Sequence, residues 1–313
     1  MISNDIALGL FFLSQTGFGV LGNSFLLGLY IINFFIGSRL RPIDLILTHV
    51  AFVNDLVLLS KGIPQTMIAL GLNHFLDDVG CKLVFYLHRV ARGLSLSTTC
   101  LLSTFQAIII SPRNSKCSKL KARVSKHIVH FYFFCWTFHL LINFLILINI
   151  KGPKRSKNIT RIQDLIYCSA TSYASANIAL YVFIISLPDI SCVAIMVWTS
   201  GYMVFILYRH HQRIQSIYGN NLTLGGSPEN RTTQTILLLV FTFVSFYSLN
   251  SILVLLIHFK KLPSWLIHTS AFLAACFPSC SPFVLIISDS QVSKYYLALW
   301  GKIKPQSWYY TTR

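Results

Sequence analysis

Charged and polar side chains inside long apolar runs are the residues of this sequence best placed to do chemistry. The set is Asn54, Asp55, Lys61, His88, Arg89, Arg92 and Asp189. A charge at the middle of a membrane helix costs about 2.5–3.5 kcal/mol on insertion scales, so such residues are usually paired or functional. His88 and Arg92 are four residues apart, which places both on one helix face, close to Phe85.

Two compatible interpretations of this polar set stay open. In the first, the charges form ion pairs, Arg92 or Arg89 with Asp189, and Lys61 with Asp55. In the second, part of the set lines a cavity that binds a ligand. The candidate ligand-binding residues are Phe85, His88, Arg89, Arg92 and Asp189, and Asn54, Asp55 and Lys61 are then structural polar residues within the membrane.

Motifs for catalysis are missing from the sequence. It contains no Gly-x-Ser-x-Gly, no His-Glu-x-x-His, no P-loop and no dinucleotide-binding glycine motif. His127 and His130 can share a helix face, but no carboxylate lies near them in the sequence to complete a metal site. We therefore expect a protein that is not an enzyme and that uses no metal and no cofactor.

The composition decides which elements must carry these side chains. Of the 313 residues, 54% are hydrophobic and only 11% are charged, and the mean hydropathy is +0.62. Soluble domains carry about 25% charged residues, so this chain cannot cover itself with a water-facing surface. Abundant Phe, Leu and Ile exclude intrinsic disorder. The chain is expected to be a polytopic membrane protein.

Seven apolar segments are long enough to cross a bilayer as helices, which takes about 20 residues each. They lie near 6–36, 43–70, 82–111, 128–150, 174–208, 234–259 and 263–288. We predict an all-α, seven-transmembrane helix bundle that forms one domain over 1–313, with 289–313 as a cytoplasmic tail. Prolines inside these segments should kink the helices; they are Pro64, Pro188, Pro278 and Pro282.

Basic residues indicate how the bundle is oriented. Fifteen Lys and Arg fall in loops on the side of Arg39 and Arg41, and seven fall on the other side. The positive-inside rule then places the N-terminus outside the cell and the C-terminus inside. With a net charge of +17, the basic loops are expected to lie against an anionic membrane leaflet, and no nucleic-acid partner is expected. Residues expected to face that leaflet or a cytoplasmic partner are Arg113, Lys116, Lys119, Lys121, Arg123, Lys126, Arg209 and Arg213.

This topology leaves two cysteines, Cys81 and Cys168, on the oxidising side of the membrane. We expect them to form a disulfide that holds the loop before the fifth segment against the third segment. Of three Asn-x-Ser/Thr triplets, the one at Asn158 falls outside, whereas those at Asn221 and Asn230 fall inside. Asn158 is therefore the predicted glycosylation site.

Four stretches of the sequence carry a family resemblance: Ser60–Met67, Cys81–Ser115, Met196–His211 and Phe277–Phe283. They are similar to the corresponding helices of vomeronasal type-1 receptors, which are pheromone receptors of the G-protein-coupled receptor class. The resemblance implies recognition of small volatile or semi-volatile cues and activation of an inhibitory-type G protein. It also implies a location in the plasma membrane of vomeronasal sensory neurons.

The sequence departs from the wider rhodopsin-like pattern at its activation motifs. Phe105-Gln106-Ala107 stands where that pattern has Asp-Arg-Tyr, so no arginine is available for the usual contact with the sixth helix. The rhodopsin-like activation switch therefore cannot be transferred to this chain.

Two alternative functions compete with that of a pheromone receptor. A bitter-taste-type receptor is opposed by the expected Cys81–Cys168 bond, and a small-molecule transporter or channel is opposed by the lack of an internal repeat.

Overall fold

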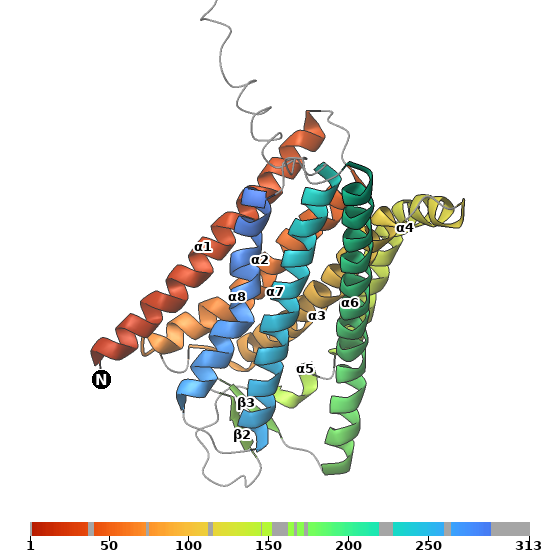
Figure 1. Ribbon diagram of the computed structural model, residues 1–313. Helices are drawn as coiled ribbons and strands as arrows, with labels where there is room; N and C mark the ends of the chain where they lie inside the picture. The colour runs from red at the N-terminus through yellow and green to blue at the C-terminus, as the bar shows by residue number, and fades with distance from the viewer. Residues whose placement is uncertain are drawn as a thin grey trace, which may run out of the picture.

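The computed structural model describes residues 2–36, 41–72, 75–111, 115–144, 146–151, 162–165, 168–171, 175–218, 228–259 and 264–288. Within these residues, seven long helices form a bundle, so the predicted seven-helix fold class is confirmed (Figure 1). The long helices are α1 (Ile2–Phe35), α2 (Pro42–Ala69), α3 (Asp78–Ile110), α4 (Ser115–Ile142), α6 (Ser175–Tyr218), α7 (Pro228–Phe259) and α8 (Ser264–Ser288).

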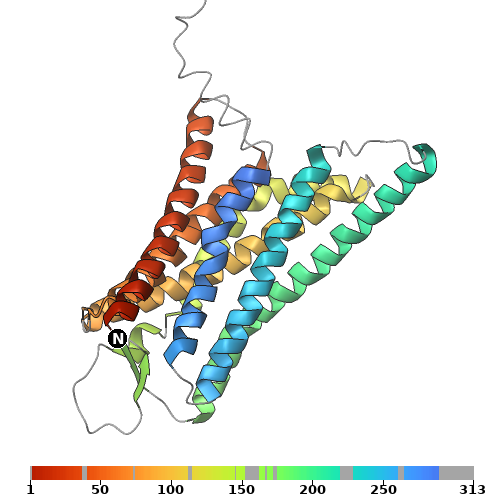
Figure 2. The same cartoon turned by 60° about the vertical axis from the view of Figure 1, so that its left-hand side comes forward.

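A short helix and a small sheet, which the all-α prediction did not contain, lie in the chain between α4 and α6. These elements are α5 (Ile146–Asn149), β1 (Ile150–Lys151), β2 (Ile162–Leu165) and β3 (Cys168–Thr171). β3 lies in the middle and pairs antiparallel with β1 and with β2. The sheet is at the same end of the bundle as the N-terminus (Figures 1 and 2), and we call this end the sheet end and the opposite one the far end.

Two helices differ from the predicted segments. α4 begins at Ser115 and ends at Ile142, whereas the apolar segment was placed at 128–150. Hydropathy marks where the chain is apolar, and a helix can begin earlier, among basic residues. α6 continues to Tyr218, ten residues past the predicted end at 208. Its 44 residues correspond to about 66 Å of helix, more than twice the thickness of a bilayer core.

Six of the described helices have the length and apolar character needed to cross a membrane. They are the spans Ile6–Phe35, Pro42–Ala69, Asp78–Ile110, Phe183–His210, Thr233–Leu253 and His268–Ile287. α4 is not among them, because its first half is rich in Lys, Arg and His. The predicted tail, 289–313, lies outside the described residues.

Two asparagine side chains tie the helices together inside the apolar core. Asn54 Nδ2 of α2 donates a hydrogen bond to Ser281 Oγ of α8 at 2.9 Å. Asn23 Nδ2 of α1 donates to the carbonyl oxygen of Pro278, also at 2.9 Å. Pro282, four residues further along α8, has no N–H with which to satisfy that carbonyl. Asn23 thus supplies the donor that the proline removes, so this buried carbonyl of α8 keeps a hydrogen-bond partner.

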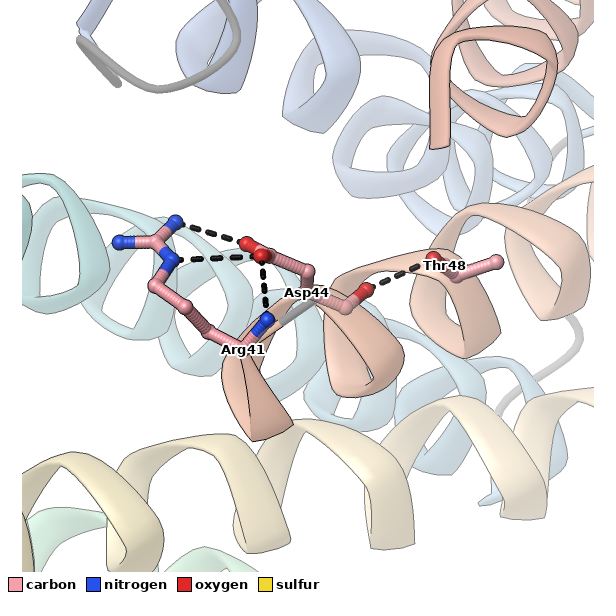
Figure 3. Close-up of polar contacts among 3 residues, drawn as sticks. All are labelled: Arg41, Asp44 and Thr48. Atoms are coloured by element: carbon pink, nitrogen blue, oxygen red, sulfur yellow. Dashed lines mark hydrogen bonds and ion pairs between the residues drawn. The ribbon is translucent and has the colours of Figure 1, made fainter. Parts of the chain in front are cut away.

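The start of α2 is held by a buried carboxylate (Figure 3). Asp44 Oδ2 accepts hydrogen bonds from the backbone N–H of Arg41 at 2.9 Å and from its Nε at 3.2 Å. Asp44 Oδ1 forms an ion pair with the same guanidinium at 2.7 Å. Thr48 Oγ1 donates to the carbonyl oxygen of Asp44 at 2.7 Å. Asp44 is fully buried, and this pairing compensates its loss of hydration.

Candidate ligand-binding site

A small cavity of about 40 Å³, partly open to the outside, lies between α2, α3, α7 and α8. Its wall consists of Val57, His88, Arg92, Ser95, Phe243, Phe246, Tyr247, Asn250, Leu273, Ala274, Phe277 and Pro278. Arg92 follows Cys81 by eleven residues of α3, so the cavity lies about 16 Å along that helix from the disulfide. A mostly apolar wall with a few polar groups is typical of small-molecule sites.

The polar side of the cavity is positively charged. His88 and Arg92 both line it, as the four-residue spacing predicted. The positive charges of Lys61, Arg92 and Arg89 all act on the imidazole of His88. Ser60 Oγ lies 3.4 Å from His88 Nδ1 and links this histidine to α2. No carboxylate is present among the residues that line the cavity, so its field favours an anion or a hydrogen-bond acceptor.

Arg92 is connected to Asp189 through an intervening tyrosine. The Arg92 guanidinium lies over the ring of Tyr247, 4.8 Å from the ring centroid. The Tyr247 hydroxyl donates a hydrogen bond to Asp189 Oδ2 at 2.6 Å. One residue each from α3, α7 and α6 therefore forms a continuous contact, which we call the Arg92–Tyr247–Asp189 bridge.

A second, smaller cavity of about 20 Å³ lies on the other side of Arg92, between α3, α4 and α6. Arg89, Arg92 and Asp189 line it, together with His139 and Asn143. Arg92 is thus shared by both cavities, and its position over Tyr247 sets the boundary between them.

Aromatic side chains of α7 and α8 form the apolar wall of the first cavity. Phe243 and Phe277 meet edge to face, with ring centroids 4.6 Å apart. Phe243 also stacks on Tyr247 at 5.7 Å. These contacts make a rigid surface against which an apolar ligand body can lie.

The predicted ion pairs Arg92–Asp189 and Lys61–Asp55 are not present in the described part of the chain. The Arg92 guanidinium lies over the ring of Tyr247, whose hydroxyl bonds to Asp189, so the tyrosine links the two charges in place of a direct ion pair. Asp55 accepts a hydrogen bond from Ser24 of α1 at 3.1 Å, and no ion pair joins it to Lys61. Six residues of helix turn through about 600°, so these two side chains point in directions about 120° apart.

Other predicted site residues take different places. Phe85 packs at the disulfide with Cys81 and Cys168, and it is not among the residues that line either cavity. Asn54 is a structural residue bonded to Ser281, with Ser95 Oγ 3.4 Å from its Oδ1.

Two residues of the site were not predicted from the sequence. Tyr247 and Asn250 of α7 face the cavity, although both sit in a run of ordinary apolar helix. Asn250 is 7% exposed, and its Oδ1 has no hydrogen-bond partner among the described residues. The three-residue spacing of Tyr247 and Asn250 was the available signal, because it places both on one helix face.

The structure joins Cys81 and Cys168 by a disulfide, with Cα atoms 5.9 Å apart, and this is the pair expected from the topology. The bond attaches β3 to the first turn of α3 at the sheet end. Asn158 and Arg113 lie outside the described residues. Arg123, Lys126 and Arg209 are exposed, and Lys116, Lys119, Lys121 and Arg213 lie in α4 and α6.

Comparison with known proteins agrees with this architecture. The chain superposes on squid rhodopsin with a TM-score of 0.70 at 16% identity, over 97% of this chain and 87% of that one, which is a likeness of fold. It is 44% identical to human vomeronasal type-1 receptor 4, over 95% of this chain and 99% of that one. It is 29% identical to zebrafish olfactory receptor class A-like protein 1, over 91% and 90%.

The same comparisons decide between the alternatives that the sequence left. Residues 6–298 match the profile of the vomeronasal organ pheromone receptor family, which is a receptor family and not an enzyme family. With the seven-helix bundle and the membrane-spanning helices, this makes the protein a multi-pass membrane receptor of the G-protein-coupled type. The chain belongs to the vomeronasal organ pheromone receptor family, whose type-1 receptors are its relatives.

Proposed function

We propose that this receptor detects small pheromone-like molecules in the cavity between α2, α3, α7 and α8. It signals through an inhibitory-type G protein from the plasma membrane of vomeronasal sensory neurons, with the sheet end outside the cell. The proposal rests on the residues that line this cavity. The cavity wall joins the guanidinium of Arg92 on α3 to aromatic and amide side chains of α7, so an occupant contacts two helices at once.

The charge of the cavity favours neutral or anionic ligands over amines. His88 and Arg92 line it, and Lys61 and Arg89 add positive charge close by. An ammonium group placed there would meet like charges and find no carboxylate on the cavity wall. A carboxylate or another acceptor can pair with Arg92, while its apolar body lies against Phe243 and Phe277.

Asn250 adds a second polar contact to this scheme. Its buried amide oxygen has no partner among the described residues, and leaving a buried acceptor unpaired is costly. A ligand hydroxyl that reaches Asn250 would remove that cost. The proposed ligand is therefore a mostly apolar small molecule with an acceptor for Arg92 and a donor for Asn250.

Reporter cells that express the receptor test this function with matched compounds. Each set has one carbon skeleton and carries a carboxylic acid, an alcohol or an amine at the same position. We expect dose-dependent responses to acids or alcohols and weaker responses to amines. A set in which the amine is the strongest agonist would contradict the ligand class, and no response to any urinary or glandular compound would count against the receptor function.

Two variants show whether the response arises in this cavity. Arg92→Met should reduce the potency of an active acid by roughly 10-fold or more, because it removes a charge-assisted hydrogen bond. Lys82→Met is the matched control, because Lys82 lies near the start of α3 and lines neither cavity. Equal loss of potency in the two variants would place the ligand elsewhere.

The type of G protein is tested in the same cells. Responses through an inhibitory-type G protein should lower cyclic AMP and should disappear after ADP-ribosylation of that G protein by pertussis toxin. A response that survives the toxin would assign the receptor to another G-protein class without affecting the ligand proposal.

A further inference from the structure

The far half of the bundle contains polar contacts that the ligand site does not use. Ser103 of α3 and Thr199 of α6 are 2.7 Å apart through their hydroxyl oxygens. Nearer the far end, Gln106 Nε2 of α3 donates a hydrogen bond to Thr233 Oγ1 of α7, also at 2.7 Å. Gln106 and Thr233 are 3% and 1% exposed, so water does not compete for this contact.

The Gln106–Thr233 pair lies near the ends of its two helices. Gln106 is four residues before the end of α3 at Ile110, and Thr233 is five residues after the start of α7 at Pro228. The pair therefore joins α3 and α7 where a cytoplasmic partner would approach, under the proposed orientation. It occupies the position at which this sequence lacks the arginine of the wider rhodopsin-like pattern.

Two contacts that involve polar or charged side chains join α3 and α7, and they are equally spaced on both helices. The first is Arg92 over Tyr247 at the ligand cavity, and the second is the Gln106–Thr233 pair. Fourteen residues separate the two contacts on each helix, which corresponds to about 21 Å. No proline interrupts α7 between Thr233 and Tyr247, so this part of the helix can move as one rigid element.

We propose that Gln106 and Thr233 are positioning residues that hold the far end of α7 against α3 in the resting receptor. A ligand that displaces Tyr247 from Arg92 shifts α7, and the shift breaks the Gln106–Thr233 hydrogen bond at the second contact. This inference rests on the proposed signalling function, because it assigns the contact that signalling must break.

The Gln106–Thr233 hydrogen bond joins two uncharged side chains, which suits a contact that must break during activation. Both groups are neutral, so separating them leaves no buried charge, unlike the separation of an arginine from a carboxylate. Gln106 Oε1 is buried and has no hydrogen-bond partner among the described residues. The Gln106 amide is therefore only partly satisfied at rest, and a modest ligand-binding free energy can overcome its bond to Thr233.

Substitutions of matched size test the pair through ligand-free signalling. Thr233→Val and Gln106→Met keep the side-chain volume and remove the hydrogen bond. Each should raise basal G-protein signalling per receptor at the cell surface by roughly 3- to 10-fold, the population change expected from losing one hydrogen bond. The double variant should be no more active than the more active single variant, because both remove the same contact.

Two control variants separate this role from general packing. Thr233→Ser keeps the hydroxyl and should restore wild-type basal signalling. Thr242→Val removes a hydroxyl that bonds within α7, to the carbonyl oxygen of Leu239, and should leave basal signalling unchanged. Wild-type basal signalling in both Thr233→Val and Gln106→Met, at normal surface levels, would overturn the proposal.

Hydrogen exchange of the purified receptor supplies a readout that needs no G protein. Backbone amides in the first turns of α7 after Thr233 should exchange roughly 3- to 10-fold faster in Thr233→Val than in Thr242→Val. If Thr233→Val exchanges faster but neither the wild type nor any variant signals, the result counts against the proposed receptor function. The role of the Gln106–Thr233 pair in holding α7 would still be supported. Equal exchange in the two variants would overturn the pair itself.

Discussion

The indole N–H of Trp136 on α4 donates a hydrogen bond to Nε2 of His49 on α2 across 3.0 Å. His49 Nδ1 lies 3.0 Å from Thr98 Oγ1 on α3, and Tyr132 stacks on the imidazole at 4.1 Å. Because Trp136 can only donate, His49 must accept at Nε2 and carry its proton on Nδ1. One neutral histidine thereby joins α2, α3 and α4, away from the ligand cavity.

Trp136→Phe should therefore destabilise the receptor. It keeps an aromatic ring but leaves a buried acceptor of His49 unpaired, which costs about 1–3 kcal/mol. Thermal unfolding in detergent should show a lower midpoint for this variant. Trp198→Phe is the matched control, because Trp198 is 80% exposed, and its midpoint should stay near that of the wild type. Equal midpoints for the two variants would contradict the role of the Trp136–His49 bond.

Close contact between α3 and α4 predicts a strong effect of a single methyl group. A Cβ at Gly93 would overlap the imidazole of His139, whose Nε2 is held 2.9 Å from Ser97 Oγ. Gly93→Ala should lower surface expression and the unfolding midpoint, because the packed histidine cannot move aside freely. Gly201→Ala, at a helical position with open space, should be neutral or stabilising by up to about 1 kcal/mol. Normal expression of Gly93→Ala would show that the helices can separate there.

The Arg92–Tyr247–Asp189 bridge predicts that a charge swap fails. Arg92→Asp with Asp189→Arg would restore a direct ion pair, but the structure has Tyr247 between the two positions. Surface expression of the double variant should therefore be no better than that of the weaker single variant. Tyr247→Phe should keep the contact with Arg92 and lose the hydrogen bond to Asp189. Rescue by the swap would mean that the two charges meet directly.

Loss of the disulfide should be costly. The Cys81–Cys168 bond spans 87 residues, and closing a loop of that length contributes about 4–5 kcal/mol in the chain-entropy description. Cys81→Ser and Cys168→Ser should each reduce surface delivery strongly, and the double variant should be no worse than either. Cys280→Ser is the control, because Cys280 is an exposed free thiol. Peptide mapping without reduction should recover Cys81 and Cys168 linked in the wild type.

Glycosylation tests the proposed orientation. With the N-terminus outside, the loop that contains Asn158 is extracellular, and Asn221 and Asn230 are cytoplasmic. Glycosidase treatment should therefore change the gel mobility of the wild type and of Asn221→Gln, and should leave Asn158→Gln unchanged. A glycosidase-sensitive Asn158→Gln protein would place a different loop outside and would reverse the orientation.

Prediction from the sequence succeeded where the burial environment is the same for a whole segment. Long apolar runs cannot face water, so the number of helices and the fold class followed from composition. The spacing of His88 and Arg92 on one helix was equally secure, because both belong to the same rigid element. The insertion cost of charge placed both residues inside the bundle, and it left open whether they form ion pairs or line a cavity.

Contacts between helices were not decided by the sequence. The ion pairs Arg92–Asp189 and Lys61–Asp55 were chemically sensible, yet the rotation of each helix about its axis gave Tyr247 and Ser24 as partners. Tyr247, Asn250 and Thr233 were not singled out from the sequence, because a tyrosine, an asparagine or a threonine in an apolar helix costs little. The three-residue spacing of Tyr247 and Asn250 was the one available signal. The sequence by itself determined a seven-helix membrane receptor with a buried cationic face on its third helix. Only the packing of α7 against α3 decided what that face contacts, because partners from distant segments meet through the relative rotation and depth of whole helices.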